Sequence, residues 1–255
     1  MKRFLSFIIV LVLSLSLFAF AGCTKDSDDA NGGKVVVNGL TIESGVVVSY
    51  EPTSASDVEL EIPEKAGGVY VSEIAKEVFK GCKALKTVKI PAGMRKINSN
   101  AFRDCSNLEG VYIEDLAGWC GIEFVGNFSN PINNNKCGNL YINNVLAEEL
   151  IIPSHVNRIE SRTFYMCTSI RKITIPKSVN FIGQHAFYGV TTNLERFRFE
   201  DPNNWGYSSD PNSTKGSTLF QALKVEYRVP GDTGWNSAIA AYIHFGQYYW
   251  IKSDS

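Results

Sequence analysis

Two segments of the chain decide its fold: ALKTVKIPAGMRKINSNAFRDC (Ala84–Cys105) and SIRKITIPKSVNFIGQHAFYGV (Ser169–Val190). Each reads as an apolar strand ending at a proline, then a second apolar pair, then Ala-Phe before a turn. Val88 and Ile90 alternate with polar neighbours, which is the period of two expected of a strand with one buried face. Proline has no N–H to donate, so it ends the strand and turns the chain.

The pattern repeats every 23 residues. Four phenylalanines mark it as two pairs, each spaced by 23 residues: Phe79, Phe102, Phe164 and Phe187. Three of them are followed, three residues later, by a cysteine: Cys82, Cys105 and Cys167. Between Pro91 and Pro153 one copy is stretched by 16 residues. A repeat of this size cannot bury its apolar side alone, so the period predicts stacked coils with the phenylalanines and cysteines in the core.

The copies resemble the BspA-like leucine-rich repeat family, whose pattern is L-x-x-I-x-I-P-x-S-V-x-x-I-G-x-x-A-F-x-x-C. The resemblance implies a repeat solenoid, mainly β, with a leucine-rich repeat right-handed coil of about six 23-residue repeats. It also implies an N-terminal β-hairpin cap and a C-terminal cap containing a short helix. We therefore expect a cap over 39–56, repeats over 57–226 with an insert at about 114–146, and a cap over 227–255.

The N-terminus predicts a targeting segment. Lys2 and Arg3 precede the apolar run FLSFIIVLVLSLSLFAF, and Ala-Gly stands directly before Cys23. A basic start, an apolar middle and small residues are typical of a secretory signal, here residues 1–22. The segment resembles a bacterial lipobox, with Phe20 in place of the usual leucine, and this implies lipidation of Cys23. An uncleaved anchor is the alternative, although 17 apolar residues are at the short limit for crossing a bilayer.

Residues 23–38 are polar and glycine-rich at their start and predict a flexible tether. Lys25-Asp26 followed by Asp28-Asp29 resembles the surface-export signal of Bacteroidetes lipoproteins, although a solvated linker explains the same charges. We expect a protein lipid-anchored at the outer membrane or cell surface, which touches the membrane through the lipid only. The sequence leaves open whether the body faces outward or into the periplasm.

Composition and motifs argue against several functions. The balance of 25 basic and 26 acidic residues gives no basic excess for binding nucleic acid. The histidines His155, His185 and His244 form no His-Glu-x-x-His pair, and no nucleophile elbow or phosphate loop occurs. No Cys-x-x-Cys suggests zinc. We therefore expect no catalytic residue, metal or cofactor. Cys120 and Cys137, both in the insert, either pair in an oxidising compartment or stay free.

The outward positions of the main strands form the candidate binding face. One column contains Glu61, Lys89, Tyr112, Ile151, Thr174 and Arg198; its neighbour contains Glu59, Thr87, Gly110, Glu149, Lys172 and Arg196. Both columns run from acidic to basic. Repeated sheet surfaces with varied side chains bind proteins or glycans, and an ordinary solvated sheet gives the same pattern.

These observations favour a non-catalytic binding or adhesion module for protein partners. The family resemblance implies adhesion to host matrix proteins or to other cells. The alternative is a glycan-capturing accessory lipoprotein of a surface uptake system, in which aromatic residues around Trp205 and Trp250 form a sugar platform. Covering of the last coil explains the same aromatic residues.

Overall fold

The computed structural model describes residues 33–133, 137–190, 194–201, 205–209, 212, 218–219 and 249–252. The chain divides into two units, of which the second, Asn31–Ser255, contains all the described residues. The predicted signal peptide, Cys23 and the predicted C-terminal helix lie outside the described residues. Within them, no helix is long and apolar enough to span a membrane.

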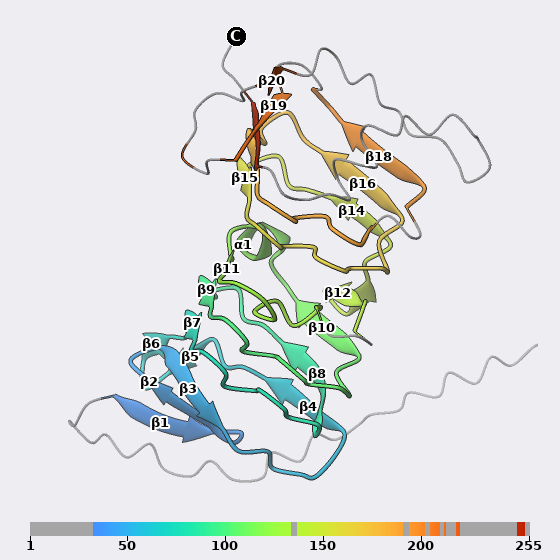
Figure 1. Ribbon diagram of the computed structural model, residues 1–255. Coiled ribbons are helices and arrows are strands. Elements are labelled where there is room, and N and C mark those ends of the chain that lie inside the picture. Colours follow the sequence, from blue (N-terminus) through green and yellow to red (C-terminus); the bar gives the residue numbers. More distant parts are fainter. Residues whose placement is uncertain are drawn as a thin grey trace, which may run out of the picture. The chain divides into compact units, whose positions relative to one another are not determined.

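The second unit is a mainly β solenoid of about six turns (Figure 1). Its main strands form two sheets. The first has the order β13-β12-β10-β8-β4 and the second the order β14-β16-β18. Their bounds are β4 Val58–Glu61, β8 Leu85–Lys89, β10 Gly110–Ile113, β12 Leu140–Ile142, β13 Val145–Leu146, β14 Glu149–Ile151, β16 Lys172–Ile175 and β18 Arg196–Phe199. All neighbours are parallel except β12 and β13, which form an antiparallel hairpin.

A second side of each coil contributes short strands after the proline turn. In the first half these are β7 (Glu73–Ile74), β9 (Lys96–Ile97) and β11 (Glu123–Phe124), all parallel. In the second half β15 (Arg158–Ile159) pairs with β17 (Phe181–Ile182) in the same way. These strands are two residues long because each coil turns again before the position of the repeat phenylalanine.

The repeat phenylalanines stack inside the coils, as the period predicts. Phe79 and Phe102 lie 4.8 Å apart between ring centroids and Phe164 and Phe187 5.3 Å apart, with both pairs nearly parallel. All four side chains are buried. Cys105 and Cys167 are buried beside them, whereas Cys82 is half-buried. A backbone ladder runs along the same side, for example from Phe79 N–H to Ala101 O at 2.8 Å.

The N-terminal hairpin is formed by β2 (Leu40–Glu43) and β3 (Val46–Tyr50), with β1 (Lys34–Val37) antiparallel to β2. β3 runs parallel to β7 and so covers the open edge of that sheet. A small hairpin, β5 (Lys65–Ala66) and β6 (Val69–Tyr70), contains the extra residues of the first copy. Covering an open edge prevents further strand pairing there.

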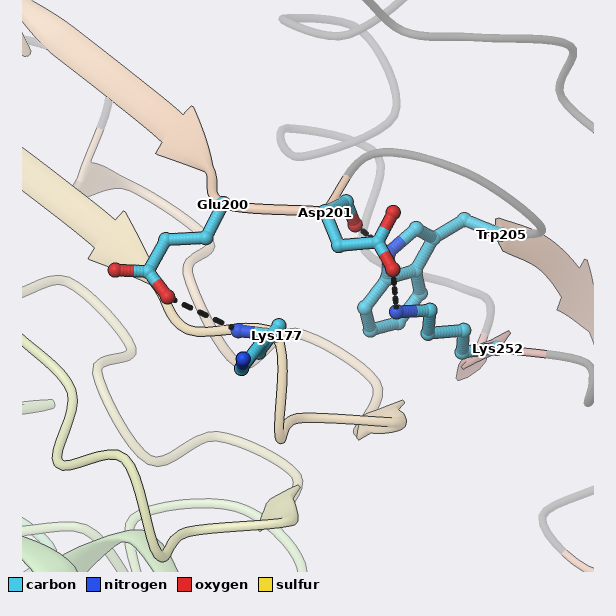
Figure 2. A network of polar contacts seen from close by, with 5 residues as sticks. All are labelled: Lys177, Glu200, Asp201, Trp205 and Lys252. Carbon is cyan, nitrogen blue, oxygen red and sulfur yellow. Dashed lines mark hydrogen bonds and ion pairs between the residues drawn. The ribbon is translucent and has the colours of Figure 1, made fainter.

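The last coil is covered by distant strands. β21 (Tyr249–Lys252) pairs antiparallel with β17 and with β19 (Trp205–Ser208), and β20 (Thr218–Leu219) extends the sheet. Figure 2 shows the polar contacts that fix this region: Lys252 Nζ lies 2.5 Å from Asp201 Oδ2, and Trp205 Nε1 donates to Asp201 O at 3.1 Å. Nearby, Lys177 N donates to a Glu200 carboxylate oxygen at 3.3 Å.

The described residues of the expected insert, 114–133 and 137–146, form a connection that we call the seam. It contains α1 (Leu116–Cys120), β11, β12 and β13. Phe102 N–H donates to Phe128 O, the contact that Phe79 N–H makes to Ala101 O one coil earlier. Buried Ser129 therefore stands where the next repeat phenylalanine would be.

Polar side chains inside the seam join the two repeat blocks. Trp119 Nε1 and Asn130 Nδ2 each donate to Thr163 O at 3.0 Å, and Asn130 Nδ2 also donates to Arg162 O at 2.7 Å. Glu160 N–H donates to Cys120 O at 2.9 Å. The stack of rings is interrupted here, and hydrogen bonds together with buried Trp119 take its place.

Candidate binding face

The outward side chains of the main strands, here called the strand face, lie in the predicted columns within each sheet. Glu61 is registered with Lys89 and Lys89 with Tyr112 in the first sheet. In the second sheet Ile151 is registered with Thr174 and Thr174 with Arg198. The neighbouring column is also continuous within each sheet, from Glu59 through Thr87 to Gly110, and from Glu149 through Lys172 to Arg196.

The seam interrupts both columns between Tyr112 and Ile151. Tyr112 is registered not with Ile151 but with Tyr141 of β12, and Tyr141 is registered in turn with Leu146 of β13. The columns predicted from the repeats therefore omit two strands. Tyr141 and Leu146 belong to the strand face, and both stand between the two halves of the predicted set.

A pair of stacked tyrosines lies at the middle of the face. The ring centroids of Tyr112 and Tyr141 are 4.4 Å apart and their planes differ by 5°. Gly110 makes room for them, since a Cβ there would lie 3.0 Å from Tyr141 Cε2 and 3.3 Å from Tyr112 Cε2. Partial burial, and then the neighbouring Tyr141 and Glu59, raise the pKa of Tyr112. Its hydroxyl is therefore neutral near pH 7 and remains a hydrogen-bond donor.

Exposed aliphatic side chains adjoin the tyrosines. Leu146 is exposed beside Tyr141, and Ile151 on β14 is 62% exposed. Ala147 and Glu148 alone separate β13 from β14. Large aliphatic side chains left in water on a sheet are informative because burial by a partner would be favourable, by about 25 cal/mol per Å² of apolar area. Tyr112, Tyr141, Leu146 and Ile151 together are called the central strip.

The first sheet carries an acidic excess that is partly neutralised. Lys89 Nζ lies 2.8 Å from a carboxylate oxygen of both Glu61 and Glu114. The hydrogen bond to Glu114 and then that to Glu61 raise the pKa of Lys89. Glu59, on the outermost strand, is exposed and makes no ion pair among the residues that the structure describes.

The second sheet carries a basic excess. Arg196 reaches across Lys172 to Glu149, with an N–O distance of 3.0 Å. In the described part of the chain Lys172 and Arg198 form no ion pair, and Arg198 is exposed. The two ends of the strand face therefore differ in charge, as the columns predict, and the central strip separates them.

A second stacked tyrosine pair lies on another side of the coil. Tyr165 and Tyr188 directly follow the repeat phenylalanines, and their rings are 5.0 Å apart. His185 contacts Tyr188 edge-on at 5.7 Å. Burial and then the Arg162 cation lower the pKa of His185, so the imidazole is neutral near pH 7. We call these turns the turn ridge; in the first two coils the equivalent positions are Lys80 and Arg103.

The buried cysteines have no features of a reactive site. All five described cysteines are free thiols, including Cys120 and Cys137, so the disulfide left open by the sequence is absent here. Burial raises the pKa of four thiols to about 12, those of Cys105, Cys120, Cys137 and Cys167. Thiols react as thiolates, so these groups are inert near neutral pH. Among the described residues no cluster of His, Cys, Asp and Glu could hold a metal.

Both tryptophans named for the predicted sugar platform are buried. Trp205 is 2% and Trp250 8% exposed. Trp205 contacts Phe199 at 5.3 Å and packs on the last coil, so its ring faces are covered by the protein. Within the described ranges, the stacked pairs Tyr112–Tyr141 and Tyr165–Tyr188 are partly exposed. The former was only half found from the sequence, since the repeat columns included Tyr112 and omitted Tyr141.

Comparison with known proteins agrees with the repeat pattern. The family model for the BspA type leucine rich repeat region matches residues 59–118 and 120–209, in six copies. No match was found among curated proteins.

Solved structures similar to the chain include three bacterial proteins. A leucine-rich repeat protein from Bacteroides capillosus ATCC 29799 is 18% identical with a TM-score of 0.30, covering 66% of this chain and 99% of that one. A leucine rich cell surface protein from Faecalibacterium prausnitzii A2-165 is 20% identical with a TM-score of 0.32, covering 72% and 56%. A leucine-rich repeat protein from Bacteroides ovatus ATCC 8483 is 25% identical with a TM-score of 0.31, covering 54% and 36%.

The family match spans more than half of the chain and includes every repeat phenylalanine. Its boundaries also include every outward residue of the strand face. The chain belongs to the BspA type leucine-rich repeat family.

Proposed function

We propose that this protein is a lipid-anchored, non-catalytic cell-surface module that binds protein partners through its strand face. The observation that carries the proposal is the central strip, in which two stacked tyrosines and two exposed aliphatic side chains lie between an acidic and a basic end. Aromatic anchors surrounded by charged groups are the usual composition of a protein-binding hot spot.

The chemistry of the core supports a binding role. The buried thiols are held protonated, and His155 and His185 have no acid, base or metal partner in an accessible cluster within the described residues. Catalysis needs convergent groups with matched pKa values in a concave site. Binding by a rigid sheet needs only fixed side chains, and the parallel register of the repeats supplies them.

A protein partner fits the strand face better than a glycan does. The tryptophans expected to hold sugars are buried. The faces of Tyr112 and Tyr141 that stack on each other are closed to a sugar ring. The alternating charges and aliphatic groups instead match an extended polypeptide surface, on which apolar and charged side chains are mixed.

Partner binding is tested with matched double variants of the secreted full chain. Tyr141→Ala with Leu146→Ala removes half of the central strip, and Tyr165→Ala with Tyr188→Ala removes the other tyrosine pair as a control. Binding to a panel of immobilised host matrix proteins is measured by biolayer interferometry. We expect the strip variant to weaken binding about 30-fold, equivalent to ~2 kcal/mol at a hot spot. Loss of binding in the control alone would place the contact elsewhere.

The lipid anchor is tested separately. Cys23→Ala removes the thiol that a lipoprotein pathway modifies, so the variant should move from the membrane fraction to the soluble fraction. Protease shaving of intact cells should release the wild-type body if it faces outward. A Cys23→Ala protein that remains in the membrane fraction contradicts lipid anchoring, and complete protection of the wild type from protease contradicts surface exposure.

A further inference from the structure

The strands of the strand face are balanced in number about a hairpin. They lie in two sheets, β4, β8, β10, β12 and β13 in the first and β14, β16 and β18 in the second, so the midpoint of their order along the chain falls within the β12–β13 hairpin. The outward columns occupy equivalent positions along the strands of the two sheets, because Lys89, Ile151 and Thr174 each stand two residues before a proline. Each strand before the turn of this hairpin therefore has a counterpart of the same rank after it in the order along the chain.

We propose that the strand face binds the strand face of a second copy of this chain, related by a two-fold axis that runs along the strands through the β12–β13 hairpin. A two-fold interface joins the same patch of both copies, so the patch must be complementary to itself. The inference rests on the proposed function, because it names a partner for the same face.

The charged ends match in this arrangement. Rotation places β4 of one copy over β18 of the other, so exposed Glu61 faces exposed Arg198 in one row. In the neighbouring row Glu59 faces Arg196. Each contact occurs twice by symmetry. Glu59 and Arg198 make no ion pair within their own chain among the described residues, so both are available to a partner.

The inner strands avoid repulsion. β8 lies over β16, which places Lys89 against Thr174 and Lys172 against Thr87. No two like charges are directly opposed, although each sheet contains cations. If the second copy were instead placed with its ends in the same order, Arg198 would face Arg198 and Glu61 would face Glu61. Charge therefore selects a two-fold axis along the strands over one that runs across them.

The apolar residues meet at the axis. β10 lies over β14 and brings Tyr112 onto Ile151, and β12 lies over β13 and brings Tyr141 onto Leu146. The whole central strip is then buried, including Ile151, which is 62% exposed in the single chain. An apolar centre with a charged rim is the arrangement found in stable interfaces.

Charge reversal tests the arrangement by sedimentation equilibrium of the full chain carrying Cys23→Ser, at low salt and concentrations up to ~1 mM, where a millimolar Kd is still measurable. We expect a concentration-dependent dimer that weakens as salt rises, because the rim pairs are solvent-screened. Glu61→Lys and Arg198→Glu should each weaken dimerisation at least tenfold, since each homodimer then contains two like-charged contacts.

Mixing the two variants is the decisive arm. In the mixed dimer the lysine introduced in one chain faces the glutamate introduced in the other, and the remaining contact is the original Glu61–Arg198 pair. The mixture should therefore dimerise within about threefold of the wild type, a difference below ~1 kcal/mol. Lys76→Glu reverses an exposed charge away from the strand face and should change nothing, and thermal melts check that every variant folds.

A chain that stays monomeric to ~1 mM, a range that covers weak complexes, overturns the inference, as does a mixture that fails to regain the dimer. Either result leaves the proposed function standing if the Tyr141→Ala, Leu146→Ala variant still loses binding to a matrix protein. Both proposals would be contradicted if the mixture failed to regain the dimer and if the Tyr141→Ala, Leu146→Ala variant still bound its matrix protein as the wild type does.

Discussion

Neighbouring coils are held together by different residues in the regular repeats and in the seam. In the coils, phenylalanine rings stack at 4.8 and 5.3 Å and the next coil repeats the same contact. In the seam, Ser129 occupies the phenylalanine place and Trp119 and Asn130 donate hydrogen bonds to Thr163 O instead. The comparison teaches that a repeat can be interrupted without breaking the solenoid, provided that the exposed backbone groups of the next coil find partners.

The seam also gives the strand face its centre. The strands on either side of the seam contribute Tyr112 and Ile151 to the outward column, and the seam adds Tyr141 and Leu146 between them. Departure from the repeat thus coincides with the part of the face best suited to bind. The predictions that follow test this division of roles.

Removal of a stacked ring should have the largest effect. Phe102→Ala deletes a fully buried ring between two coils and should lower the free energy of unfolding by ~3–5 kcal/mol. Ser129→Ala, at the equivalent place in the seam, loses only a hydrogen bond to Gly126 O and should cost ~1 kcal/mol. Urea unfolding measures both. If both variants lowered the free energy of unfolding equally, the seam and the coils would not be stabilised by different contacts.

Alkaline pH should destabilise both regions. Four buried thiols have a pKa of about 12 when folded, against about 8.5 in an unfolded chain. Between these values the folded state binds more protons, so stability present below pH 8.5 is lost as pH rises. From pH 7 to pH 9 the free energy of unfolding should fall by roughly 3 kcal/mol in total.

The same thiols allow the alkaline loss of stability to be compared between the coils and the seam. Cys105 and Cys167 lie in regular coils, and Cys120 and Cys137 in the seam. Replacing either pair by alanine should remove about half of the alkaline loss if the seam is as dry as the coils. Melts at several pH values measure this. A seam pair that reacts with a thiol reagent in the native protein would show instead that water reaches the seam.

The amide of Asn130 should matter more than an exposed amide with the same type of bond. Asn130→Ala leaves Arg162 O and Ile132 N–H without that partner in a buried site and should cost ~2 kcal/mol. Asn107 donates to Lys83 O at 2.8 Å on the surface, and Asn107→Ala should cost under ~1 kcal/mol, since water replaces the bond. Chemical unfolding separates the two; similar costs would contradict a bridging role for Asn130.

The ion pairs of Lys89 should contribute least. Both glutamates are well exposed, so Lys89→Met should change the free energy of unfolding by under ~1 kcal/mol. Because the folded pKa of Lys89 is raised, its contribution is complete below the unfolded pKa of about 10.4 and is lost as pH rises through the higher folded value. Thermal melts in low and high salt check it, and a large salt-insensitive loss would contradict the reading of these pairs as surface contacts.

The sequence predicts the coils because the same physics recurs at each copy: an apolar strand, a proline, and a phenylalanine at a fixed distance. It does not predict β12, since Leu140–Ile142 is followed neither by a proline nor by a repeat phenylalanine. A local signal was present in the Asn143-Asn144 dipeptide, because asparagine tolerates the positive φ that a tight hairpin turn requires, here 50° and 65°. Tyr141 and Leu146 flank that turn and could have been placed by it.

The positions of other site residues are set by contacts that the repeat period does not predict. Trp205 and Trp250 are far apart in the sequence and are buried because β19 and β21 pair across the last coil. Glu114 joins the Lys89 pair from just beyond β10. Predicting such contacts requires knowing which distant segments pack against each other. The repeat period predicts this only for equivalent positions of neighbouring coils.

Hydroxyl-radical footprinting tests most directly whether the central strip is the contact surface. Oxidation of individual side chains is compared between the protein on intact cells, where partners are present, and the dilute purified chain. Protection on cells should be concentrated at Tyr112, Tyr141, Leu146 and Ile151, while Tyr165, Met166 and Tyr188 on the turn ridge react equally in both samples. Protection of the turn ridge with an unchanged central strip would contradict the account.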